Sequence, residues 1–179
     1  MKFSKYIAIA FFAAFALAGC KNESLQQYLV DKQDNDKFLK MDVAASLLQN
    51  NSSNFSEEEK EIWKTIKKVN VVAYPIKDGN ISEYETEKGK LETILDQEQY
   101  KELTRIKSAE WNATLKYMGD EDAIDEVIVF ASDNEKGFAV FRLLGENMRP
   151  DQMLKLMNSL ENGKMDLSQL SGLGEMFKG

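Results

Sequence analysis

Apolar residues recur along the chain with two different spacings, and each spacing predicts a different kind of element. The spacing typical of a helix runs from Phe38 to Gln49, although the part before Asp42 also fits an edge strand. A second helix is predicted over Ser56–Lys68, because Ser56 and Glu59 have the spacing of a capping box and one face of the segment is apolar.

The charged stretch over residues 82–107 predicts two more helices, with a break near Asp96-Gln97 and the second helix running from Glu98 to Ile106. A final helix is expected to begin at Arg149-Pro150-Asp151, where the proline suits the first turn. Its predicted inner face consists of Met153, Leu154, Met157 and Leu160.

Four segments have the composition of strands. Val69–Ile76 is mostly apolar, which indicates a position inside a sheet, and Trp111–Tyr117 alternates as a half-buried strand does. Ile124–Ala131 and Phe138–Leu144 follow, joined by a short loop that ends in Gly137, and such a loop forces antiparallel neighbours.

Together these elements predict one α+β domain over residues 37–163, with a mainly antiparallel four-stranded sheet and helices packed on one face. Residues 20–36 are predicted to form a polar tether, although the apolar spacing of Leu25, Tyr28 and Leu29 leaves one or two helical turns as the alternative. Residues 164–179 are expected to be a weakly ordered amphipathic tail.

Residues 1–19 have the pattern of a secretory signal peptide, because two lysines precede an apolar run that is too short to cross a bilayer core of about 30 Å. The following Leu17-Ala18-Gly19-Cys20 resembles the lipobox of bacterial lipoproteins. This resemblance implies cleavage between Gly19 and Cys20, and a thioether from the Cys20 thiol to an acylated glycerol whose fatty chains, such as palmitate, hold the protein in a membrane. The alternative is an ordinary signal peptide with an incidental cysteine.

The resemblance also implies an address in the cell envelope. Lys21 stands where an inner-membrane retention signal has Asp, which favours the outer membrane with the domain facing the periplasm. Surface export is associated with clustered acids after the cysteine, and only Glu23 is present there, so the cell surface remains the second possibility.

Composition narrows the possible partners and chemistry. The 23 basic and 30 acidic residues give a net charge of −7, and removing residues 1–19 with their two lysines would make it −9, so nucleic acid is a poor partner. The absence of His and the single Cys exclude His-dependent triads, His/Cys zinc sites and an internal disulfide. The sequence therefore indicates no catalytic residue, no cofactor-binding residue and no metal ligand.

Three weaker signals have ordinary structural explanations. The acidic run Asp120–Glu126 could hold Ca²⁺, but it lacks the EF-hand positions and is better interpreted as a solvated turn. Trp63 and Trp111 are predicted to lie in the core. The methionines near the C-terminus are predicted to pack in the core, with a partner groove or Cu(I) ligation as alternatives.

The order of elements and several local patterns resemble a known family. The relevant segments are Gln99–Leu103, Glu126–Val129, Phe138–Gly145 and Met153–Leu160. They are similar to the family of small Bacteroidetes lipoproteins catalogued as domain of unknown function 4252, over about Phe38–Leu160. The Gly145–Met148 segment departs from the family's pattern. The resemblance implies an α+β envelope domain and carries over no catalytic residue.

We therefore expect a lipid-anchored envelope protein that is not an enzyme and that binds a protein or another envelope component. Two alternatives remain open at this point. A small hydrolase that uses only carboxylates would need at least two buried acids about 5–10 Å apart in a pocket. A periplasmic ligand carrier would need a closed apolar cavity.

Overall fold

The computed structural model describes residues 22–46, 55–77, 80–109 and 111–161. The predicted signal peptide (1–19), Cys20 and the predicted tail (164–179) lie outside the described residues.

The strands form one antiparallel sheet of six strands in the order β1-β2-β6-β5-β4-β3. The elements in chain order are α2 (Leu25–Asp31), β1 (Leu39–Ala44), α4 (Glu57–Lys64), β2 (Ile66–Pro75), α5 (Ile81–Leu95), β3 (Lys101–Lys107), β4 (Trp111–Asp120), β5 (Ala123–Asp133), β6 (Gly137–Met148) and α6 (Pro150–Glu161). The predicted α+β class and antiparallel sheet are confirmed, whereas the predicted number of four strands is wrong.

The two additional strands are the edges of the sheet, and both had been predicted mainly as helices. β1 confirms the alternative of an edge strand before Asp42, and β3 replaces the helix predicted over Glu98–Ile106. In β1 half-buried and exposed positions alternate, whereas β3 shows no such alternation. In β3 the spacing of Leu103 and Ile106 matches a helix by coincidence, and only the pairing with β4 makes it a strand.

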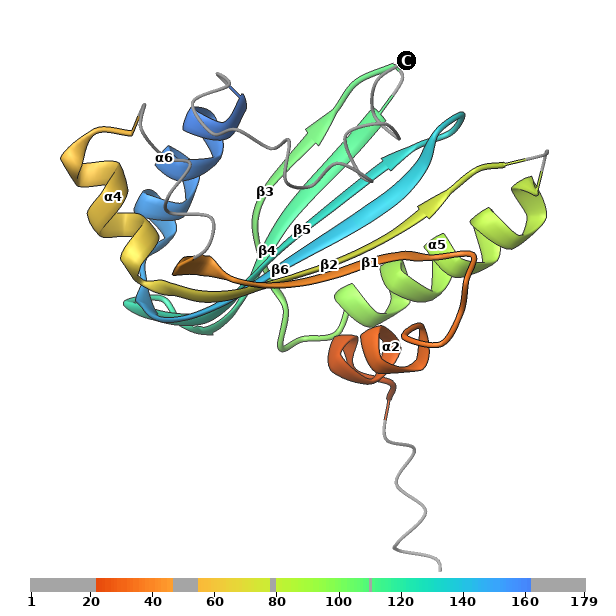
Figure 1. The fold of residues 1–179 in the computed structure, drawn as a ribbon, viewed down its shortest axis with the longest axis horizontal. Coiled ribbons are helices and arrows are strands. Elements are labelled where there is room, and N and C mark those ends of the chain that lie inside the picture. The colour runs from red at the N-terminus through yellow and green to blue at the C-terminus, as the bar shows by residue number, and fades with distance from the viewer. Residues whose placement is uncertain (1–21, 47–54, 78–79, 110, 162–179) are drawn as a thin grey trace, which may run out of the picture.

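Helices cover both faces of the sheet, so the prediction of helices on one face is wrong (Figure 1). Trp63 of α4 and Met153 of α6 belong to the core on one face, whereas Tyr28 of α2 and Tyr84 of α5 belong to the core on the other. The central strands are apolar on both faces, and each apolar face must be covered to exclude water.

Successive side chains of β2 alternate between the two cores, one on each face of the sheet. Val69 and Val71 point into the core under α4 and α6, and Val72 and Tyr74 point into the core under α2 and α5. The prediction that this strand is internal is confirmed, since β1 and β6 flank it. It begins at Ile66, directly after α4, which ends at Lys64 rather than at the predicted Lys68.

The segment predicted as a tether contains a docked helix. Ser24 caps α2 in a reciprocal capping box with Gln27, and Leu25, Tyr28 and Leu29 are buried against the domain. The alternative of one or two helical turns is therefore confirmed, and the flexible tether over residues 20–36 is wrong for its described part.

The C-terminal half of the structure agrees more closely with the elements predicted from the sequence. β4, β5 and β6 form two hairpins, and the Asp133 carboxylate accepts the backbone N–H groups of Glu135 and Lys136 in the second turn. In α6, Met153 is buried as predicted, but Leu154 is 37% exposed. Trp63 is buried as predicted, whereas Trp111 is 41% exposed, so its assignment to the core is wrong.

Two glycines give a test of this packing. At Gly145 of β6 a Cβ atom would lie 2.3 Å from the backbone oxygen of Thr65, whereas at Gly89 of α5 it would meet nothing within 4 Å. We expect Gly145→Ala to lower the free energy of unfolding by about 1–3 kcal/mol. Gly89→Ala is expected to raise it by about 0.5–1 kcal/mol, because alanine is the better helix former. Urea denaturation measures the free energy of unfolding of both variants. Equal changes in the two variants would contradict the close packing of Gly145 against Thr65.

Candidate functional site

The predicted lipidation residue Cys20 and the predicted cleavage point after Gly19 lie outside the described residues, but the chain directly after them is well held. The Gln97 side chain donates to the backbone oxygen of Glu23 at 2.7 Å. The backbone N–H of Leu25 donates to the Tyr100 hydroxyl oxygen at 3.1 Å. The chain is thus attached to the domain from Glu23 onward.

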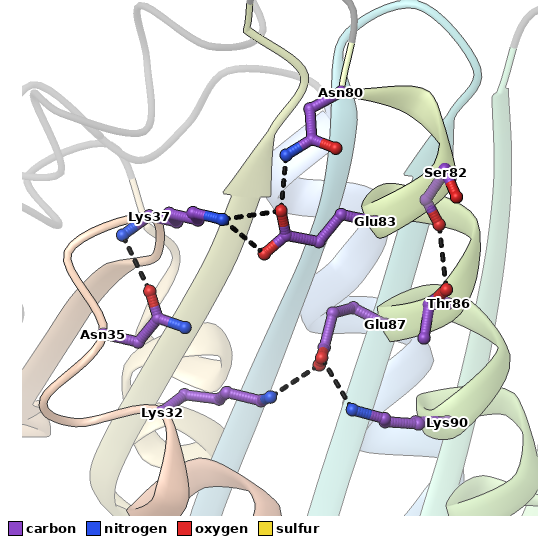
Figure 2. Close-up of polar contacts among 9 residues, drawn as sticks. All are labelled: Lys32, Asn35, Lys37, Asn80, Ser82, Glu83, Thr86, Glu87 and Lys90. Carbon is purple, nitrogen blue, oxygen red and sulfur yellow. Dashed lines mark hydrogen bonds and ion pairs between the residues drawn. The ribbon is translucent and has the colours of Figure 1, made fainter.

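A buried carboxylate fixes α2 to α5. The Tyr28 hydroxyl donates to Glu87 Oε2 at 3.0 Å, and Lys32 Nζ lies 2.7 Å from the same oxygen. Lys90 Nζ lies 2.7 Å from the other oxygen, Oε1. Figure 2 shows the two lysines converging on Glu87. The Lys32 ammonium also lies over the Tyr28 ring, 5.0 Å from its centroid.

This cluster shifts two pKa values in opposite directions. Burial by itself would raise the pKa of Glu87, but hydrogen bonds from Lys32, Lys90 and Tyr28 outweigh it and hold that pKa below its usual range. Burial and then the negative charge of Glu87 raise the pKa of Tyr28 far above its usual range. Tyr28 therefore remains a protonated donor, and the cluster is a structural connection between helices.

A second carboxylate on α5 holds the segment before β1. Lys37 Nζ lies 2.7 Å and 3.0 Å from the two carboxylate oxygens of Glu83, and the Asn80 amide donates to one of them (Figure 2). The hydrogen bond from Lys37 is the main cause that lowers the pKa of Glu83.

The sequence did not single out the buried ion pair in the sheet. Arg142 of β6 donates through Nη2 to Glu126 Oε2 of β5 at 2.7 Å, and its Nη1 donates to the Gln26 side chain of α2. Glu126 is 2% exposed and Arg142 is 9% exposed. Glu126 Oε1 and Arg142 Nε have no hydrogen-bond partner in the structure. The one feature of the sequence that points to this pair is that each charged residue lies at a buried position of a mostly apolar strand.

The acidic run Asp120–Glu126 therefore divides into two parts. Asp120, Glu121 and Asp122 are exposed, so the interpretation as a solvated turn is confirmed for them, whereas it is wrong for the buried Glu126. Within the described residues no group of three His, Cys, Asp or Glu side chains could hold a metal ion.

An open groove of about 410 Å³ lies between α5 and the part of the sheet formed by β3, β4 and β5. Its lining residues are Lys88, Glu92, Leu95, Asp96, Arg105, Lys107, Asn112, Thr114, Lys116, Phe130 and Ser132. Four of them are cations and two are acids, although the chain as a whole carries a net charge of −7. This groove is the candidate binding site, and the sequence did not predict it because its residues come from four separate elements.

A buried lysine, Lys116, lines the groove where α5 ends. Lys116 Nζ donates to the backbone oxygen of Leu95, the last residue of α5, and lies 3.4 Å from Asp96 Oδ1. A cation at this position satisfies a free carbonyl at the C-terminus of the helix. It thereby fixes α5 over β4 and defines the wall of the groove.

The arrangement does not resemble a carboxylate-only active site. The two acids that line the groove, Glu92 and Asp96, are exposed. The buried acids Glu59, Glu87 and Glu126 serve in a helix cap, in the α2–α5 contact and in the pair with Arg142, respectively. What the groove offers is a set of hydrogen-bond donors beside apolar surface, which suits binding.

The comparisons with known proteins give one match. The family described as Domain of unknown function (DUF4252) matches residues 28–156. Neither a curated protein nor a solved structure matches the chain. Among the helices of the described residues, none is both long enough and apolar enough to span a bilayer.

The Glu87 cluster predicts a pH-dependent contribution to stability. Glu87→Gln is expected to lower the free energy of unfolding by about 1–3 kcal/mol at neutral pH, because it removes charged hydrogen bonds. A lowered folded-state pKa stabilises the protein above the ordinary glutamate pKa of about 4.3 and loses that effect as the pH falls through the folded-state pKa. The difference between wild type and variant should therefore shrink below about pH 4.

Chemical denaturation at several pH values measures this difference. Glu85→Gln on the same helix is the control, because it makes the same charge change at an exposed residue, and it should change stability by less than about 0.5 kcal/mol. A difference for Glu87→Gln that stays constant from pH 7 to pH 3 would contradict the assigned role.

The Glu126–Arg142 pair gives a second prediction. Glu126→Leu leaves Arg142 as an uncompensated buried charge and should cost about 3–5 kcal/mol of unfolding free energy, and Arg142→Met, which leaves Glu126 unpaired, should also destabilise. The double variant Glu126→Leu/Arg142→Met removes both charges and should recover most of that loss. A double-mutant cycle by urea denaturation measures the coupling, and additive effects of the two sites would show that the charges do not interact.

Proposed function

The chain belongs to the family described as Domain of unknown function (DUF4252), and from this premise we propose that it is a lipid-anchored protein of the cell envelope. In this proposal its α+β domain binds a protein or another envelope component and catalyses no reaction.

The observation that carries the anchoring proposal is the position of Cys20 relative to the folded domain. The only cysteine of the chain follows Leu17-Ala18-Gly19, as the lipobox requires, and the domain already binds the backbone of Glu23 through Gln97. Two residues separate Cys20 from Glu23, and the three Cα–Cα steps between them span at most about 11 Å. A lipid on Cys20 would therefore hold the α2 side of the domain close to the membrane surface.

The net charge supports a lipid anchor rather than a charged surface as the means of attachment. A chain with an excess of acidic residues is repelled by anionic headgroups, so two or three acyl chains would have to supply the binding energy. We place the protein in the outer membrane, facing the periplasm, because Lys21 follows the cysteine and only Glu23 supplies an acid nearby.

The binding role is supported by the form of the candidate site. The groove beside α5 is open and is lined mainly by charged and polar side chains. A hydrolase that uses only carboxylates for catalysis would bring buried acids together there. A ligand carrier would enclose an apolar cavity. The groove has the features of neither.

The anchoring proposal predicts the behaviour of a single substitution. Cys20→Ser should abolish lipidation, leave the signal peptide uncleaved by the lipoprotein peptidase and release the protein from the membrane pellet after an alkaline wash. Lys21→Ser, which keeps the cysteine, is the matched control and should fractionate as wild type.

Mass spectrometry of the wild-type N-terminus gives the direct measurement. We expect Cys20 as the first residue, with the mass of an acylated glycerol thioether. An unmodified Cys20 would overturn the anchoring proposal, as would a Cys20→Ser variant that sediments with membranes to the same extent as wild type.

A further inference from the structure

The groove beside α5 gathers cationic and neutral hydrogen-bond donors from adjacent strands, and we propose that it binds a ligand that carries a phosphate group. This inference deepens the proposed binding function, on which it rests, by naming the chemistry of the ligand.

Four donor side chains form a compact rectangle on the floor of the groove. Arg105 and Lys107 lie two residues apart on β3, and the strand register places Thr114 and Asn112 of β4 directly opposite them. Side chains two residues apart on a strand are separated by about 7 Å, and opposite Cβ atoms by about 5 Å. Ser132 of β5 adds a hydroxyl group directly opposite Asn112.

Three of these side chains have unused hydrogen-bonding capacity. Within the described residues, Lys107, Asn112 and Thr114 make no side-chain hydrogen bond or ion pair with another residue. In that part of the chain the one partner of the Arg105 side chain is Glu102, at 2.5 Å, and both side chains are half exposed. A ligand can therefore engage the rectangle without breaking a buried contact.

The number of donors favours phosphate over carboxylate. A guanidinium, an ammonium, two hydroxyl groups and an amide exceed what the two oxygens of a planar carboxylate can accept, whereas a tetrahedral phosphate presents several oxygens in different directions. Arginine and lysine together with hydroxyl donors are a common combination for binding phosphate. Of the acids that line the groove, Glu92 and Asp96 belong to the α5 side, and the one carboxylate bound to a donor of the rectangle is that of Glu102 on Arg105.

The groove also accommodates more than an isolated ion. The buried side chains of Phe130 and Leu95 are among its lining residues. An organic group attached to the phosphate would therefore contact apolar surface. Its volume of about 410 Å³ is in the range of small-molecule sites.

The phosphate could come from a membrane lipid or from a soluble ester. Leu95 and Asp96 line the groove, and the next residue, Gln97, binds the backbone of Glu23, close to the proposed anchor. The headgroups of the membrane that holds the anchor would therefore lie close to the groove. The experiment below distinguishes a lipid headgroup from a free phosphate ester.

The test is isothermal titration calorimetry of the full chain in non-ionic detergent at low ionic strength. The probes are glycerol 3-phosphate as the soluble ester, short-chain phosphatidylglycerol as the lipid headgroup, and succinate as a carboxylate of similar size. We expect saturable binding of at least one phosphate probe, and the tighter of the two identifies the source. Succinate should bind at least 10-fold more weakly.

Three variants test the donor rectangle. Arg105→Ala/Lys107→Ala should weaken binding at least 10-fold, whereas Lys60→Ala/Lys64→Ala makes the same charge change on α4, on the other face of the sheet, and should have little effect. Thr114→Val keeps shape and charge and should weaken binding about 3–10-fold, because it removes one hydrogen bond.

Glu102→Gln is expected to change the phosphate affinity in the opposite direction. It removes the carboxylate that occupies Arg105, and it should therefore strengthen binding. A destabilised protein would lose affinity, so a gain cannot arise from unfolding.

Several results would overturn the proposal. They are the absence of saturable binding by both phosphate probes, equal affinity for succinate, or equal effects of the groove variant and the α4 control variant. Repeating the titration with the Cys20→Ser variant distinguishes this proposal from the anchoring proposal. If that variant binds the soluble ester as wild type does, the groove assignment stands whether or not the cysteine carries a lipid.

Discussion

The structure depends on one constraint, which is that the central strands of the sheet are apolar on both faces. β2 contributes Val69 and Val71 to one core and Val72 and Tyr74 to the other, and β6 contributes Ala139 and Phe138 in the same way. Neither face can remain in water without a large loss of hydrophobic free energy. Two pairs of helices are therefore required, and they come from parts of the chain that are far apart in sequence (Figure 1).

The need to cover the second face explains the position of the N-terminal segment. α5 alone covers only part of that face, and α2 completes the cover with Leu25, Tyr28 and Leu29. The contacts of Glu87 and Glu83 then hold α2 and the segment that leads into β1 against α5. As a consequence the chain enters the folded domain within a few residues of Cys20, and an anchor there would be short.

The same arrangement leaves β3 and the outer part of β4 beyond the cover of α5. Lys116 fixes the end of α5 over β4, and the strands beyond it form the floor of the groove. The polar and basic side chains of that floor are the ones that an uncovered strand must present to water. The groove is therefore a product of a six-stranded sheet that is wider than the helices packed on it, and among the described residues no helix residue bonds to the side chains of Arg105, Lys107, Asn112 and Thr114.

The sequence by itself determined the elements whose pattern is local. The capping box at Ser56, the alternation of Trp111–Tyr117 and the turn before Gly137 each depend on neighbouring residues, and α4, β4 and the β5–β6 hairpin follow from them. It also supplied the family resemblance and the pattern that ends at Cys20, because both are read from contiguous residues. Tertiary structure alone decided that β1 and β3 are strands, that α2 is docked, and that Glu126 meets Arg142. Each of these depends on a partner many residues away: the edge strands acquire their conformation from backbone pairing, and the groove acquires its donors from strand register.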